Sequence, residues 1–501
     1  MSTAKKFAGQ TALYGLSTIA GRVLNFFLTP IYTRTYPAKI YGVFGNLYAY
    51  ASMLNALLAF GMETTFFRYL NKRSDDKQLV YNNTFGAILT VSVIFFLCTF
   101  PFAATITNWI RIGDATPLPD YILYIKFFIG TLIIDALCII PFAKLRADGR
   151  PGRYGLLKFI NIVIFVSLNL VFIYLVPFII NHGLPGGTWM SGWFKKTWVG
   201  YVFLSNLIAS SATLIMLLPE FMKLQPKFSR ALFAEMLLYS WPVLVANFSY
   251  LVNENLDKIL LGNLLPEKVS AIQVGIYTAC AKISIFLSIF VNAFRLGAEP
   301  FFFSHAKNKN ATQTYARIMN YFIIAVCLIF VALVANIELL KYFIKGKDAA
   351  QTQIYWSGIG VIPVLLFGYV SLGIYMNLSV WYKLTDQTKY GLYISGIGAM
   401  VTIVLNVIFI PSYGYIASAW ISLAAYASMM VMSYLWGQKH YPIPYHLKKN
   451  LGYIIISIVL VYISFSVFKR NIFIGNGLLI LFGLGTLYAE RTELKAIFSK
   501  K

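Results

Sequence analysis

The sequence predicts an all-α polytopic membrane protein of about 14 transmembrane helices, with two six-helix lobes in a pseudo-two-fold relation and two further C-terminal helices. Of the 501 residues, 58% are hydrophobic and only 12% are charged, whereas about a quarter of an ordinary soluble domain is charged. Apolar runs of roughly 20 residues, long enough to cross a hydrocarbon core of ~30 Å, recur along the chain. Because lipid leaves no partner for free backbone polar groups, these runs must be helices.

The expected spans follow one another with short connections. The first follows Lys5 and Lys6 as a signal peptide would, but it is too long for the apolar region of such a peptide and lacks a small-residue cleavage site. We therefore expect it to remain as the first transmembrane helix. The expected spans are 8–32, 42–67, 84–108, 120–143, 155–180, 197–218, 234–256, 271–294, 317–337, 354–376, 389–410, 414–436, 451–468 and 472–489.

Basic residues in the connections predict the orientation. They are about twice as numerous on the side of the N-terminus as on the other side, and such an excess marks the cytoplasmic side. The densest group is Lys144, Arg146, Arg150 and Arg153, which could anchor the chain near anionic lipid or receive a phosphate-bearing substrate. We expect a multi-pass protein of the cell inner (cytoplasmic) membrane with both termini in the cytoplasm.

An internal repeat predicts the domain organisation. The pattern G-x-E-x-x-F-F occurs at 61–67 and again at 297–303, at the ends of the second and eighth spans. Six helices per half give both halves the same orientation, with a substrate site expected between them near the midplane. The expected domains are a six-helix lobe at 1–222, a second at 223–440, and two additional helices with a cytoplasmic tail at 441–501.

Charged residues inside apolar spans are the candidate binding residues. A cation near the middle of a bilayer costs at least ~3 kcal/mol, so it normally faces a polar cavity. Arg22 and Lys282 lie roughly 15 to 22 Å into their spans at 1.5 Å per residue. We expect both to bind substrate in a cationic cavity, with Lys126 as a further candidate; snorkelling or structural pairing is the alternative.

Five more residues are candidates for ion coupling or gating. Asp135 lies nine residues after Lys126 and so projects from the opposite side of the same helix. Asp257 lies at the outer end of the seventh span, where an interfacial position explains it equally well. Glu63 and Glu299 end the two repeated helices. Arg295 precedes Glu299 by four residues and can pair with it, so a structural clasp competes with a gate.

The remaining chemistry-bearing residues indicate neither an enzyme nor a metalloprotein. The four cysteines lie singly in apolar runs, and the four histidines lie in or beside expected loops. This distribution suggests no metal site and no nucleophile paired with a histidine. No cofactor is expected, although H+ or Na+ could couple transport. The net charge of +24 is better explained by membrane topology and cavity chemistry than by nucleic acid as a partner.

Seven segments, in order along the chain, carry a resemblance to a known family: 21–34, 41–43, 61–68 and 144–147 in the first half, and 255–262, 275–277 and 298–300 in the second. They resemble polysaccharide-unit (Wzx-type) flippases of the multidrug/oligosaccharidyl-lipid/polysaccharide exporter superfamily. The resemblance covers nearly the whole chain. It implies two lobes that rock around a central cavity and move a lipid-linked (polyprenyl-pyrophosphate) oligosaccharide to the outer leaflet, for surface polysaccharide or lipopolysaccharide synthesis. Membrane lipid and other polysaccharide-assembly proteins would be its partners.

Three alternatives remain open. A cationic cavity favours an anion such as pyrophosphate, which Arg grips through paired hydrogen bonds, over the organic cations of a multidrug exporter. A lipid II flippase also needs a cationic cavity and fits equally. A membrane glycan polymerase or ligase would need a substantial outer loop, whereas the longest clear outer loop here runs only from about His182 to Lys196.

Overall fold

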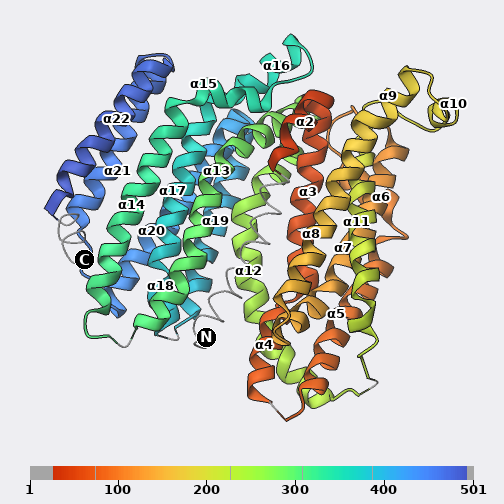
Figure 1. Ribbon diagram of the computed structural model, residues 1–501, viewed down its shortest axis with the longest axis horizontal. Helices are drawn as coiled ribbons and strands as arrows, with labels where there is room; N and C mark the ends of the chain where they lie inside the picture. Colours follow the sequence, from red (N-terminus) through yellow and green to blue (C-terminus); the bar gives the residue numbers. More distant parts are fainter. Residues whose placement is uncertain (1–25, 74, 226, 307, 386, 493–501) are drawn as a thin grey trace. The chain divides into compact units, whose positions relative to one another are not determined.

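The computed structural model describes residues 26–73, 75–225, 227–306, 308–385 and 387–492. Within these ranges the regular structure is helical, and no strand occurs (Figure 1). Thirteen of these helices are long and apolar enough to cross a membrane. They overlap the second to fourteenth expected spans, with ends that differ by up to nine residues, which confirms the predicted fold class. The first expected span, 8–32, lies mostly outside the described residues.

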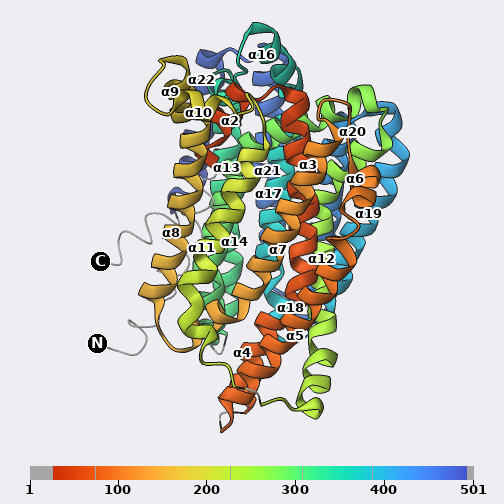
Figure 2. The same cartoon turned by 90° about the vertical axis from the view of Figure 1, so that its right-hand side faces the viewer.

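The chain forms two compact units. The first unit extends to Thr278 and also includes Gly346–Asp348 and Ile410–Gly414. In Figures 1 and 2 its long helices run side by side, with α9 and α10 beyond one end and α4 at the other. Its helices are α2 (Thr29–Thr35), α3 (Ala38–Ala59), α4 (Met62–Lys72), α5 (Lys77–Thr99), α6 (Ala103–Ile110), α7 (Leu118–Ala147), α8 (Pro151–Leu170), α9 (Val176–Asn181), α10 (Gly187–Ser191), α11 (Gly200–Phe221), α12 (Arg230–Leu264) and the first turns of α13 (Glu267–His305).

The second unit begins at Ala279 and contains the rest of α13 and the C-terminal helices. In it α17 packs on α20 and α14, and α14 packs on α21 and α22. The predicted division at 222 and 440 concerns the repeat along the chain and stays a prediction. The helices of this unit are α14 (Ala311–Ala335), α15 (Ile337–Leu340), α16 (Ala349–Trp356), α17 (Ile362–Leu378), α18 (Val380–Leu384), α19 (Lys389–Tyr413), α20 (Tyr415–His440), α21 (Leu447–Tyr462) and α22 (Ile472–Ala489).

Local sequence explains where several helices begin and bend. Pro151 occupies the first turn of α8, where its missing N–H costs nothing. The Asp76 carboxylate accepts a hydrogen bond from the Leu79 N–H at 3.1 Å and caps α5. Phe60 and Gly61, with φ of 46° and 65°, separate α3 from α4. A Cβ at Gly61 would lie 2.9 Å from the Ser240 carbonyl oxygen, so the bend also needs a residue without a side chain.

Two glycines let α3 and α13 cross at backbone contact. A Cβ on Gly42 would lie 1.8 Å from the carbonyl oxygen of Ala271, and a Cβ on Gly275 would lie 1.9 Å from that of Ala38. Small residues of this kind allow transmembrane helices to approach until their backbones touch. The contact is reciprocal, because each glycine faces the residue four positions before the other. The two segments that cross here are 41–44 and 274–277, which occupy corresponding places in the two halves of the sequence.

Candidate functional site

The first unit holds a polar cavity of about 550 Å³ among its membrane-spanning helices. Its walls come from α3, α4, α7, α8, α11 and α12. It extends from the middle of α3 and α7 to the end of the unit where α4 and the start of α8 lie. Its lining side chains that carry polar atoms are Ser52, Asn55, Glu63, Asp135, Tyr154, Lys158, Asn161, Asn206, Ser210 and Thr213.

The acidic wall of this cavity is Asp135 on α7. Its side chain is half-buried and accepts a hydrogen bond from the Ser210 hydroxyl of α11 at 2.7 Å. Lys126, nine residues earlier on α7, is exposed and places its ammonium 5.6 Å from the ring centroid of Phe100. The two charges therefore project from opposite sides of the helix, as their spacing requires. Lys126 does not line the cavity, which differs from the position expected for it.

The basic wall is Lys158 on α8. Its ammonium lies 4.2 Å from the ring centroid of Phe142, a cation–π contact worth about 0.5 to 2 kcal/mol depending on desolvation. Within the described part of the chain, no carboxylate lies within ion-pair distance of this ammonium. One turn further along α8, the Asn161 amide donates to the Thr213 hydroxyl at 2.9 Å. Lys158 is thus a half-buried cation held mainly by an aromatic face, and it remains available to an anionic group.

An ion pair lies at the end of the cavity. Glu63 on α4 accepts a hydrogen bond from Arg146, which ends α7. The Arg146 guanidinium carbon also lies 4.8 Å from the ring centroid of Phe67, in the same turn as Glu63. Glu63 is therefore fixed against the neighbouring helix, and its carboxylate neutralises the nearest guanidinium.

The dense basic group of the sequence surrounds a second carboxylate. Glu220, near the end of α11, is fully buried, and its oxygens lie 3.3 Å from Arg153, 3.9 Å from Arg150 and 2.6 Å from Lys223. A buried carboxylate needs such partners, because desolvation is offset only by close opposite charge. Part of the basic group predicted to meet lipid or substrate, Arg150 and Arg153, therefore has a structural role in holding the start of α8 to the end of α11.

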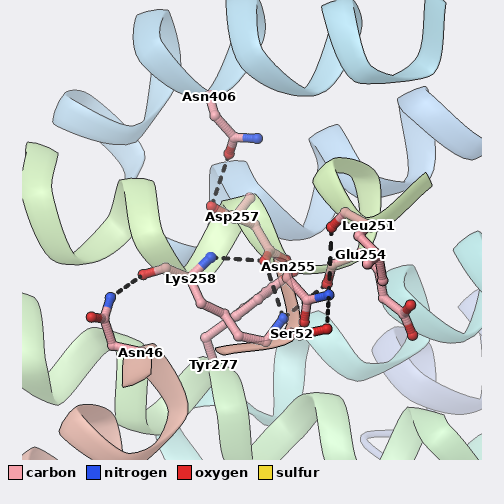
Figure 3. Close-up of polar contacts among 10 residues, drawn as sticks. Asn46, Ser52, Leu251, Glu254, Asn255, Asp257, Lys258, Tyr277 and Asn406 are labelled. Carbon is pink, nitrogen blue, oxygen red and sulfur yellow. Dashed lines mark hydrogen bonds and ion pairs between the residues drawn. The ribbon is translucent and has the colours of Figure 1, made fainter. Parts of the chain in front are cut away.

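Asp257 belongs to a separate buried cluster on α12 and α13 (Figure 3). One of its oxygens accepts from the Tyr277 hydroxyl, and the other lies 3.1 Å from the Lys258 ammonium. The Lys258 carbonyl in turn accepts from the Asn46 amide of α3 at 3.1 Å. Asn255, on the neighbouring turn, donates to the Ser52 hydroxyl at 3.3 Å. Asp257 is thus buried and bonded, not exposed at a membrane interface.

The second repeat carries its own clasp. Glu299 on α13 pairs with Lys383 on α18, and not with Arg295, which is half-buried one turn away. The separation from Glu299 to Lys383 is 84 residues, and that from Glu63 to Arg146 is 83. Lys282 is half-buried on α13, within the second unit. Arg22 lies outside the described residues. Of the predicted site residues that the structure describes, Glu63 and Asp135 line the cavity of the first unit.

Lys158 and the asparagines of the cavity were not among the site residues predicted from the sequence. Lys158 lies close enough to the start of its span to be interpreted as a snorkelling residue. The missed signal is spacing: Ser52 and Asn55 on α3, and Lys158 and Asn161 on α8, lie three residues apart on one helix face. Among the described residues, no group of three or more His, Cys, Asp or Glu side chains could hold a metal ion.

Two family models match parts of this chain. A family model described as "Polysaccharide biosynthesis protein" matches residues 156–305, and one described as "MatE" matches residues 242–408. A search of curated proteins finds no match.

Three solved structures illustrate the fold. The lipid II flippase MurJ, in an inward closed conformation, has a TM-score of 0.71 at 14% identity, covering 96% of this chain and 100% of its own. A multidrug resistance MATE family transporter has a TM-score of 0.64 at 13% identity when inward-facing, covering 84% of this chain and 94% of its own. An outward-facing multidrug resistance MATE family transporter has a TM-score of 0.58 at 14% identity, covering 86% of this chain and 95% of its own. At these identities the likeness establishes the fold.

Proposed function

Because this chain belongs to the multidrug/oligosaccharidyl-lipid/polysaccharide exporter superfamily of transporters and flippases, we propose that it flips a lipid-linked oligosaccharide across the cytoplasmic membrane. The substrate would be a polyprenyl-pyrophosphate oligosaccharide, moved from the inner to the outer leaflet for surface polysaccharide or lipopolysaccharide synthesis. The protein itself is a multi-pass membrane protein. Both termini would lie in the cytoplasm, and two lobes would alternate access to a cationic interior.

The observation that carries the proposal is the polar cavity among the membrane helices of the first unit. A headgroup rich in hydroxyls and phosphate cannot cross hydrocarbon unaided, because each unsatisfied polar group costs several kcal/mol there. The cavity supplies amides and hydroxyls from Asn55, Asn161, Asn206 and Ser210 together with the ammonium of Lys158. The polyprenyl tail could stay in lipid. No bond would be broken, so the lining residues would bind and release the headgroup and would not catalyse a reaction.

The charge balance supports an anionic substrate. Glu63 and Asp135 are each engaged by the protein, by Arg146 and Ser210 respectively, whereas Lys158 lies against the ring of Phe142 and, among the described residues, has no carboxylate within ion-pair distance. A phosphate oxygen would give this ammonium the charge-assisted hydrogen bond that it lacks. We still predict that Arg22 and Lys282 are deeper phosphate ligands. Coupling of transport to H+ or Na+ through Asp135 or Asp257 remains a proposal.

Lipid II is the second candidate substrate. The MurJ structure covers 96% of this chain, whereas the inward-facing multidrug transporter covers 84% of it. Lipid II and a polysaccharide unit share the polyprenyl pyrophosphate and differ in the headgroup. The polysaccharide unit is preferred because one of the two family models matched within the chain is described as a polysaccharide biosynthesis protein.

Reconstitution with defined substrates tests the proposal. Purified protein in proteoliposomes should expose a fluorescent undecaprenyl-pyrophosphate trisaccharide to an impermeant quencher faster than protein-free vesicles do. Lys158→Gln should slow this at least about tenfold, the loss expected when one charged hydrogen bond worth about 1.5 to 3 kcal/mol is removed. Lys126→Gln, which removes a cation outside the cavity on a neighbouring wall helix, is the matched control and should leave the rate within about twofold. If the protein flips lipid II but not the trisaccharide lipid, the proposed substrate becomes lipid II. If it transports a cationic dye and neither lipid, the proposal is refuted.

A further inference from the structure

At the opposite end of the first unit lies a second pocket, of about 330 Å³, between the end of α2, the far end of α8, α9, α10 and the start of α11. Its volume falls within the range of small-molecule sites. The twenty residues of α8 separate it by about 30 Å from the basic group at the start of that helix. With the predicted orientation, the pocket faces the outer side of the membrane.

One wall of this pocket is a stack of aromatic rings. Tyr201 stacks on Phe172 with centroids 4.7 Å apart and on Phe194 with centroids 5.2 Å apart, with interplanar angles of 14° and 8°. Trp198 meets Tyr201 edge-on at 4.7 Å. The Tyr201 hydroxyl accepts a hydrogen bond from the Lys195 backbone N–H at 2.9 Å, which ties the loop to α11. The rings are thus held in place before any ligand arrives, and the apolar face of a sugar ring packs well against such surfaces.

The other walls are basic and polar. Arg34, Lys196 and Lys347 line the pocket together with Asn181 and Ser191, and no acidic residue is among the described residues that line it. In the described part of the chain these three cations make no ion pair within 4 Å. The neighbouring Lys195, by contrast, lies 2.7 Å from Asp120 and is outside the lining.

The backbone at this pocket is strained. Thr197, between Lys196 and Trp198, has a φ of 59°, and a β-branched residue in the left-handed region is a genuine outlier. Its hydroxyl donates to the Lys196 carbonyl at 2.7 Å. Conformations of this kind concentrate at ligand-binding positions, where the surrounding structure maintains them. Here the turn at Thr197 lies between Lys196 and Trp198, which both line the pocket.

We propose that this pocket binds the saccharide of the translocated substrate, and that the saccharide carries an anionic substituent such as a uronic acid carboxylate. Stacked rings would hold a sugar face, and Arg34, Lys196 and Lys347 would hold the carboxylate. This inference rests on the proposed function, since it assigns part of that substrate a docking site on the outer side. A phospholipid headgroup would satisfy the cations but has no ring to stack against the aromatic wall.

The test measures binding without transport. Full-length protein in nanodiscs of neutral phosphatidylcholine would be titrated with trigalacturonate and with its methyl ester, which keeps the rings and removes the charges. Trigalacturonate should bind at least about tenfold more tightly than the ester. Phe194→Ala and Lys196→Gln should each weaken trigalacturonate binding about tenfold, the loss typical of an anchor residue. Lys195→Gln is the matched control and should leave binding unchanged.

The result that overturns the inference is equal binding of acid and ester, no binding of either, or equal loss in Lys195→Gln and Lys196→Gln. Displacement of trigalacturonate by phosphatidylglycerol nanodiscs at the same site, without any difference between acid and ester, would make the pocket a lipid site and also overturn it. Flipping without trigalacturonate binding would count against this inference alone. Trigalacturonate binding without flipping would count against the proposed function alone. If Phe194→Ala does not fold, the binding measurement on Lys196→Gln still tests the inference.

Discussion

Single charged residues in this chain acquire their roles from the groups that surround them. Asp135 and Lys126 looked alike in the sequence, as charges within one apolar span. The structure separates them: Asp135 receives a hydrogen bond at a polar cavity, while Lys126 is exposed outside it. Lys158 shows the reverse case, since it lies near the start of its expected span and yet lines the cavity. A sequence gives the depth of a charge along a helix, but the direction in which it points depends on how the bundle packs.

Glu490, just beyond α22, provides a prediction at this scale. It is 3% exposed, and it accepts hydrogen bonds from Tyr453 at 2.6 Å, Lys449 at 2.8 Å and Asn320 at 3.3 Å. Burial opposes ionisation, but these donors lower the pKa of the Glu490 carboxyl below its ordinary value. The contribution to stability is therefore present above the unfolded-state pKa and is lost as pH falls through the lower folded-state pKa.

Glu490→Gln should thus lower the free energy of unfolding by about 2 kcal/mol at neutral pH, less than for a fully buried pair because Lys449 is partly exposed. Thermal unfolding of purified protein in detergent measures this. The difference between the wild type and Glu490→Gln should shrink as pH falls below about 4.5. A difference that does not change with pH would show that the carboxylate charge is not what stabilises this end of α22.

At the scale of helices, the spans were predictable because each is a long apolar run, but their breaks were not. The repeated G-x-E-x-x-F-F segments have different backbones: Gly61 has a positive φ and separates two helices, while Gly297 lies inside the continuous α13. The Glu63 and Glu299 carboxylates nevertheless pair with cations at nearly equal sequence separations, of 83 and 84 residues. The sequence allowed Glu299 to pair with Arg295 on its own helix, but Glu299 pairs with Lys383 on α18.

The reciprocal crossing of α3 and α13 gives a prediction for an element pair. Gly42→Ala or Gly275→Ala would place a Cβ within 2 Å of a carbonyl oxygen unless the helices separate. Each should destabilise the protein by about 4 kcal/mol or more, the range of severe core disruption. Gly396→Ala, on a face of α19 with no atom near the added Cβ, should be neutral or stabilising. The yield of folded protein and the thermal unfolding of the three variants test this. A Gly42→Ala variant with the yield and thermal stability of the wild type would refute the close crossing.

For the whole molecule, the fold class followed from composition and span count, while the substrate path did not. Chain topology requires that polar residues far apart in sequence, such as Asn55, Asp135 and Asn206, meet at one cavity, and no local pattern contains that information. Orientation is the global property that the sequence predicts most directly, through its basic connections.

Cysteine labelling tests that orientation. Single cysteines at Lys77, Lys227 and Lys448 should be protected from a membrane-impermeant thiol reagent in intact cells, and one at Lys195 should react. The side chain of Lys195 is 60% exposed beside Asp120, so accessibility does not limit its reaction. Labelling after cell lysis controls for reactivity. Reaction at the first three sites in intact cells would invert the assignment and turn the pocket near Tyr201 toward the cytoplasm.

The most direct test of the account concerns the anionic substrate. Arg22→Glu combined with Lys282→Glu should be compared with the wild type and with Lys126→Gln for flipping of the fluorescent lipid-linked trisaccharide, at matched protein amounts in proteoliposomes. The account predicts at least about a hundredfold loss for the double reversal, because it replaces an attraction to phosphate of a few kcal/mol with a repulsion. Lys126→Gln should flip normally. Near-normal flipping by the double variant would contradict a cationic interior that carries a phosphate-bearing substrate.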